Sequence, residues 1–81
     1  ALRILKSLKE NGIVKSHKVS RIDVSNLRSI IFILDNKVEV KVKRDDYERS
    51  IKVLGESLPS IDLDEVEYID LRFEDVVIGT R

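Results

Sequence analysis

The sequence predicts an α+β domain with a single, mainly antiparallel sheet of about five strands and two helices on one face, in the order α-β-β-β-α-β-β. Three features of the 81 residues support this fold class. The chain begins with a short amphipathic segment, its hydrophobic period changes from two to between three and four at Arg44, and it ends on two apolar runs. A chain of this length is expected to fold as one domain around one small core.

The first expected element is a short amphipathic helix. Its apolar residues fall at spacings of three and four: Leu2, Ile4, Leu5 and Leu8. Asn11 and Gly12 are expected to end it, because glycine tolerates the left-handed conformation that follows many helices.

Three strands are expected next. Residues 19–24 are weakly patterned, and residues 29–34 (SIIFIL) are apolar on both faces, which is typical of a strand inside a sheet. The pair Asp35-Asn36 predicts a hairpin turn, because both residues favour the backbone of such turns. In residues 37–43 (KVEVKVK) valines alternate with charged residues, so one face of that strand is expected in solvent.

A second helix is predicted after Arg44. Asp45 or Asp46 is expected to cap its backbone N–H groups, and Pro59 marks its end. The stripe that faces the core is expected to consist of Tyr47, Ile51, Leu54 and Leu58.

Two strands are expected at the end of the chain, residues 66–73 and 76–80, with a tight turn near Glu74-Asp75. In the first of them a period of two separates two faces. Ile69, Leu71 and Phe73 are assigned to the core, and Tyr68, Asp70 and Arg72 to the other face. Asp70 and Arg72 are expected to form a surface ion pair of small energetic value.

The sequence contains no pattern typical of a catalytic or cofactor-binding site. Without cysteine there is neither a disulfide framework, a thiolate zinc site nor a cysteine nucleophile. His17, the single histidine, has no carboxylate near it in the sequence and is interpreted as a solvated loop residue. Residues 60–65 lack the ligand spacing and glycine of a calcium loop and are interpreted as a solvated acidic loop. We therefore expect a protein that is no enzyme and has no metal or cofactor.

The basic run in residues 37–44 allows an alternative function, a nucleic-acid-binding module that contacts phosphates through this strand. Glu39 interrupts the run, and no aromatic residue is expected beside it for base stacking. The preferred interpretation is a solvent-facing strand. Basic residues prevail in the first 55 positions and acidic ones in the rest, which fits either a charged partner or mutual neutralisation of the two halves.

The last strand suggests a function of another kind. Residues 76–78 are apolar on both faces, and little in the sequence protects this strand if it lies at a sheet edge. Unpaired backbone groups on such an edge can accept a strand from a partner by β-augmentation. The alternative is an ordinary strand that itself continues beyond this chain.

Residues 34–59 (LDNKVEVKVKRDDYERSIKVLGESLP), followed by YIDLRFEDVVIGTR from Tyr68, resemble the C-terminal part of the bacterial cell-division protein family FtsQ, called DivIB in Gram-positive bacteria. The resemblance runs from about Ile4 to Arg81. The residues that match its last signature are Asp70, Leu71, Arg72, Phe73 and Gly79. One departure is Lys43, which stands where the family often has glycine.

The resemblance implies a non-enzymatic scaffold of the divisome, the protein assembly of bacterial septum formation. Members have a short cytoplasmic tail, one membrane helix, a POTRA domain and a β domain on the extracytoplasmic face. Residues 1–81 resemble most of that β domain, so the membrane helix and the POTRA domain are expected to lie outside this chain. The implied partners are the division proteins FtsB (DivIC) and FtsL, and the isolated domain is expected to be a monomer or a weak edge-strand dimer.

The partner-binding residues implied by the resemblance lie at the end of the chain. They are Phe73, Glu74, Asp75, Val76, Val77, Ile78, Gly79 and Thr80. Arg28, in the turn before SIIFIL, lies near a family position that contacts an acidic residue of the partner. No nucleic-acid partner is implied.

Overall fold

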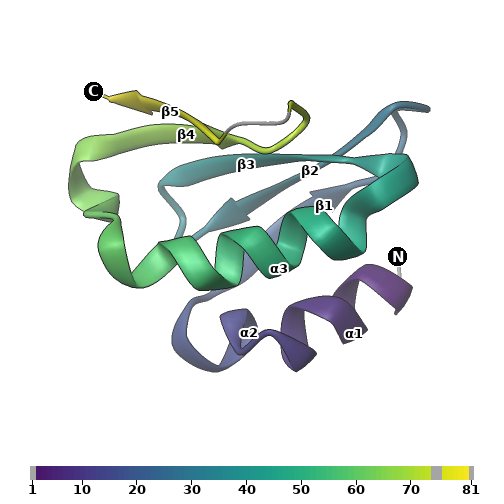
Figure 1. Cartoon of the computed structure of the whole chain (residues 1–81), viewed down its shortest axis with the longest axis horizontal. Coiled ribbons are helices and arrows are strands. Elements are labelled where there is room, and N and C mark those ends of the chain that lie inside the picture. The colour runs from purple at the N-terminus through teal and green to yellow at the C-terminus, as the bar shows by residue number, and fades with distance from the viewer. Residues whose placement is uncertain (1, 74–75, 81) are drawn as a thin grey trace.

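The computed structural model describes residues 2–73 and 76–80. This part of the chain forms one five-stranded sheet in the order β1-β2-β3-β4-β5, with the helices gathered on one face (Figure 1). β3 and β4 are parallel, and the other neighbouring strands are antiparallel. The predicted fold class is confirmed. The strands are β1 (Val19–Asp23), β2 (Ser29–Leu34), β3 (Val38–Lys43), β4 (Val66–Asp70) and β5 (Val77–Thr80).

The chain begins with two helices, α1 (Leu2–Glu10) and α2 (Ile13–Ser16), of which α2 was not predicted. Gly12 separates them with φ +74°, so the predicted end of the first helix is confirmed. Ile4 and Leu8 are buried. Leu5 is 39 % exposed, so its expected burial is wrong: the buried face is formed by Ile4, Ser7 and Leu8, and Leu5 lies at the border of that face.

The β2–β3 hairpin forms as predicted. Asp35 and Asn36 have φ values of 52° and 59°, the left-handed conformation that a two-residue turn of this kind requires. The turn closes with a hydrogen bond of 3.0 Å from the backbone N–H of Lys37 to the carbonyl of Leu34. The register that follows turns three valines of β3 into the core, Val38, Val40 and Val42.

The helix α3 (Tyr47–Ser57) follows the 3-10 turn η1 (Arg44–Asp46) and is followed by two more such turns, η2 (Leu58–Ser60) and η3 (Leu63–Glu65). Its predicted apolar stripe is confirmed, with Ile51, Leu54 and Leu58 buried and Tyr47 partly buried. Asp46 stands at the N-terminal cap position, but its side chain makes no capping hydrogen bond. The cap prediction is wrong because η1 leads directly into the helix.

One hydrophobic core lies between the sheet and the helices. It joins side chains from all three α-helices, from the three strands β2, β3 and β4 and from the segment after β4, with Phe32, Val40, Ile51 and Ile69 at 0 % exposure. The connection from β3 through α3 to the parallel neighbour β4 forms a β-α-β unit.

The last two strands are shorter than expected. β4 ends at Asp70, so the alternation that assigned Phe73 to the core no longer applies there. Phe73 is 64 % exposed, and that assignment is wrong. Ile69 and Leu71 are buried as predicted. The expected turn at Glu74-Asp75 lies outside the described residues.

Candidate functional site

The strand β5 lies at one edge of the sheet and pairs, within the described residues, with β4 (Figure 1). Its antiparallel register with β4 is regular from Tyr68 to Asp70 and shifts between Val66 and Tyr68, where the extra residue lies in β4 and not in β5. Val77 and Ile78 are 40 % and 41 % exposed. They point to opposite faces of the sheet, because side chains alternate along a strand. An apolar strand at an edge offers both backbone groups and side chains to another strand.

The opposite edge, β1, is irregular. Its register with β2 shifts between Ser20 and Asp23, and Arg21 has φ 51°. A bulge with one residue in the left-handed region interrupts the row of backbone groups that a partner strand would need. The two edges of this sheet therefore differ, and β5 is the more regular template.

Tyr68 covers the outer face of β5, the face turned away from the helices. It is the register partner of Gly79. A Cβ atom placed on Gly79 would lie 2.0 Å from Cε2 of the Tyr68 ring, so the ring occupies the space that a side chain at this position would need. Nothing in the local sequence pattern connects these two residues. The signal was an aromatic residue and a glycine in adjacent strands, but it becomes visible only when the register is known.

Asp70 and Arg72 form a bidentate ion pair where β4 ends. The guanidinium donates from Nε to Oδ1 at 2.9 Å and from Nη2 to Oδ2 at 2.7 Å. These side-chain hydrogen bonds, which outweigh burial, hold the pKa of Asp70 below its ordinary value. The Asp70 side chain is 8 % exposed and that of Arg72 38 %. The predicted surface pair is thus buried on the carboxylate side, because β3 and β5 flank β4.

A shallow hollow of about 170 Å³ lies between α3 and the segment that follows β4. The hydroxyl of Ser50 donates a hydrogen bond of 3.4 Å to the carbonyl of Leu71 and so links the two walls. Basic side chains prevail around the hollow, and two of the predicted partner residues, Phe73 and Val76, belong to it. The lining is Lys43, Asp46, Arg49, Ser50, Val53, Leu71, Arg72, Phe73 and Val76.

Arg28 lies at the same end of the sheet but is not adjacent to β5. Its carbonyl accepts a hydrogen bond of 3.0 Å from the N–H of Arg44. Arg44 directly follows Lys43, one of the residues that line the hollow. The guanidinium of Arg44 also donates to the carbonyls of Val24 and Asn26, so it ties the β1–β2 loop to the end of β3. The strands β3 and β4 stand between Arg28 and β5.

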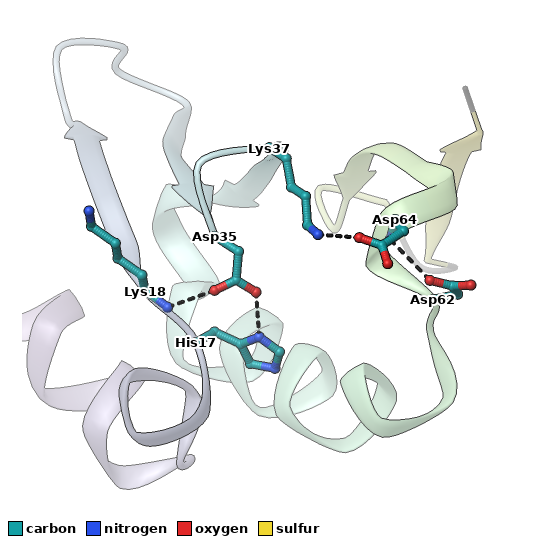
Figure 2. A network of polar contacts seen from close by, with 6 residues as sticks. All are labelled: His17, Lys18, Asp35, Lys37, Asp62 and Asp64. Atoms are coloured by element: carbon teal, nitrogen blue, oxygen red, sulfur yellow. Dashed lines mark hydrogen bonds and ion pairs between the residues drawn. The ribbon is translucent and has the colours of Figure 1, made fainter.

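At the opposite end of the hairpin, Asp35 connects the β2–β3 turn to the segment before β1 (Figure 2). The carboxylate accepts hydrogen bonds from His17 Nδ1 at 2.8 Å and from the backbone N–H of Lys18 at 2.9 Å. The bond from the His17 side chain, then that from Lys18, lowers the pKa of Asp35. His17 lies in a loop, as interpreted, but its side chain is not simply solvated, because folding brings in a carboxylate 18 positions away.

The acidic loop is also more ordered than expected. Asp62 accepts a hydrogen bond of 3.1 Å from the N–H of Asp64 at the start of η3, and Asp64 forms an ion pair with Lys37 (Figure 2). The loop is therefore attached to the hairpin turn. Among the described residues, no group of three or more acidic, histidine or cysteine side chains could hold a metal ion.

Replacing Asp35 with asparagine is expected to destabilise the fold by about 0.5–1.5 kcal/mol at neutral pH. Asparagine keeps the tolerance for positive φ but loses one carboxylate acceptor and the charge. Since the pKa of Asp35 is lowered on folding, its contribution is present above about pH 4 and is lost as the pH falls through the folded pKa. Urea unfolding at neutral and acid pH tests this, with the exposed Asp45→Asn as control. Equal effects of both substitutions would contradict it.

The exposed side of the basic strand differs from the prediction in one respect. Tyr68 lies beside Lys41, whose Nζ is 6.0 Å from the ring centroid, so an aromatic residue does stand there. However, Lys41 Nζ also lies 3.4 Å from a carboxylate oxygen of Glu39. A cation already paired with a carboxylate is poorly placed to bind phosphate, and the face as a whole has mixed charge.

A comparison with protein-family models identifies the fold's relatives. The model described as cell division protein FtsQ/DivIB, C-terminal, matches residues 1–72. The chain belongs to this family. The resemblance seen in the sequence is thereby confirmed, and with it a role in cell division.

The FtsQ/DivIB match includes Arg28 and the sequence IDLR and ends one residue before Phe73. The family is a scaffold family of cell division and not a known enzyme family. Comparisons with curated proteins and with solved structures gave no significant match. In the described part of the chain no helix is long and apolar enough to cross a bilayer.

Proposed function

We propose that this FtsQ/DivIB domain recruits other division proteins by accepting a strand from them on the free edge of β5. The partners proposed are FtsB (DivIC) and FtsL, as the family resemblance implies. The setting proposed is the extracytoplasmic face of the membrane at the division site, where a membrane helix and a POTRA domain outside this chain would anchor residues 1–81 as a β domain.

The observation that carries the proposal is the edge position of β5, with Val77 and Ile78 half-exposed on its two faces. Backbone hydrogen bonds to β5 would supply affinity, and contacts with the two apolar side chains would supply specificity. The irregular edge at β1 lacks an uninterrupted row of backbone groups to which a partner strand could bind. A partner strand is therefore expected at one edge of the sheet.

The hollow between α3 and the segment that follows β4 would make the proposed binding surface complementary to a negatively charged partner. Lys43 and Arg49 contribute two cations to its lining against the single acidic residue Asp46, whereas the third cation of the lining, Arg72, is already paired with Asp70. The exposed ring of Phe73 lies within 5.7 Å of the Arg72 guanidinium, so an apolar surface adjoins the positive charge. An acidic residue that flanks the partner strand would fit there. Arg28 lies at the same end of the sheet but is separated from β5 by β3 and β4, so it would add positive charge only at a distance.

Lysine at position 77 is expected to weaken capture of FtsB (DivIC) by tenfold or more. The Val77→Lys substitution removes an apolar contact and places a charge on the pairing edge, a device by which natural edge strands avoid pairing. Titration of the purified domain with each candidate protein, by calorimetry or interferometry, measures the effect. Ile78→Lys tests the other face in the same way.

The matched control is Ser20→Lys, which adds the same charge on the outer face of the opposite edge strand, β1. It is expected to leave affinity within about twofold of the unsubstituted domain. Amide exchange should show that all three variants keep the core. Equal binding by Val77→Lys and Ser20→Lys would remove β5 from the mechanism, and capture of neither candidate would contradict the proposed partners.

A further inference from the structure

We infer that Tyr68 is a specificity-determining residue for the strand that pairs with β5, and that it selects an apolar, preferably aromatic, side chain at the partner position opposite Gly79. The inference rests on the proposed function, since it assumes that a strand pairs with β5. It goes beyond it by assigning a contact to a residue of β4, one strand away from the edge.

The first step is the position of the ring. Three ring atoms of Tyr68 lie 2.0 to 2.5 Å from the place where a Cβ of Gly79 would be. The ring therefore stands in for the missing side chain at Gly79 on the outer face of the sheet. With an ordinary residue at position 79 the ring could not extend over β5.

The second step follows from strand geometry. Residues directly opposite each other in antiparallel strands have Cβ atoms about 4.5–5.5 Å apart and contact each other. A residue of the partner strand opposite Gly79 would find the Tyr68 ring in the place of a Gly79 side chain. A side chain of the inner strand thus reaches the partner across β5.

The third step concerns the chemistry of the contact. Val77 lies two residues before Gly79 on the same face, so the partner residue would meet a ring and an aliphatic side chain that are 37 % and 40 % exposed. The polar residues beside Tyr68 on β3, Glu39 and Lys41, lie on the far side of the ring from β5. An apolar side chain would cover this surface, and aromatic pairs are favoured beyond their buried area.

The test extends residues 1–81 after Arg81 by an Asn-Gly turn and a short threonine-rich strand, so that the added strand pairs with β5 in a fixed register. The added residue opposite Gly79 is varied as Ser, Leu or Tyr. The readout is the amide-exchange protection of β5 amides, which rises in proportion to the population of the paired state. Leu and Tyr are expected to raise protection about threefold to tenfold over Ser.

The same series is measured in Tyr68→Thr, which removes the ring and keeps a strand-forming residue, and in Tyr68→Phe, which keeps the ring. The preference for Leu and Tyr should disappear in Tyr68→Thr and persist in Tyr68→Phe. As an internal control, the same three residues are placed in the added strand opposite Thr80, on the helix side. There the protection of β5 should not depend on whether Tyr68 is present.

A preference that is unchanged in Tyr68→Thr would overturn the inference and leave strand pairing at β5 intact. If none of the added strands protects the β5 amides from exchange, the inference is overturned, and the result also counts against the proposed function. Loss of the preference in Tyr68→Phe would show that the hydroxyl, and not the apolar ring, makes the contact, which also overturns it.

Discussion

Arg72→Ala is expected to lower the free energy of unfolding by about 1–3 kcal/mol at neutral pH. The substitution leaves the Asp70 carboxylate, 8 % exposed, without the two guanidinium hydrogen bonds that it now accepts. The backbone N–H of residue 72 still donates to Oδ1 at 3.0 Å, so the carboxylate keeps one donor. The exposure of Arg72 to solvent keeps the effect below that of a fully buried pair.

The effect of Arg72→Ala should depend on pH in a definite direction. The pKa of Asp70 is lowered on folding, so the ion pair stabilises the protein above the unfolded pKa of about 3.9. This stabilisation is lost as the pH falls through the folded pKa. The difference between the unsubstituted protein and Arg72→Ala should therefore be constant near neutrality and shrink below about pH 4.

Urea unfolding over this pH range measures the difference. Arg49→Ala is the matched control, because Arg49 lines the same hollow and is exposed, and it should change stability by less than about 0.5 kcal/mol. A difference for Arg72→Ala that stays the same in acid would contradict the ion-pair explanation. It would then indicate that Arg72 acts by packing, for example against Phe73.

Gly79→Val is expected to destabilise the fold by about 1–3 kcal/mol, although valine is in general a better strand former than glycine. The reason is steric: the new Cβ would stand 2.0 Å from the Tyr68 ring, which must move away from β5. The measurement combines urea unfolding with NMR. In the unsubstituted protein the Gly79 Hα protons should show a ring-current shift and nuclear Overhauser contacts to the Tyr68 ring.

The control for this prediction is Gly79→Val in a Tyr68→Thr background. Once the ring is absent, valine should no longer destabilise and should follow its strand propensity. Thr80→Val, at the neighbouring position of the same strand, should be nearly neutral. Unchanged or increased stability of Gly79→Val with Tyr68 present would show that the ring moves at little cost, and would contradict the prediction.

The sequence alone predicted the elements whose signals are local. The alternation of valines in β3, the Asp35-Asn36 turn and the stripe of α3 depend on residues within a few positions of one another, and all three were confirmed. The resemblance in residues 34–59 and at IDLR was likewise visible in the sequence. It led to the FtsQ/DivIB family that the match over residues 1–72 shows.

Of the candidate site, the sequence predicted an apolar terminal strand and the residues Val77 to Thr80, but not their surroundings. The pairing of Asp35 with His17, the burial of Asp70 and the position of the Tyr68 ring over Gly79 were decided by the tertiary structure. The physical reason is that periodicity specifies which face of an element a side chain occupies. Which strand lies beside it, and in which register, is settled only when the whole sheet assembles.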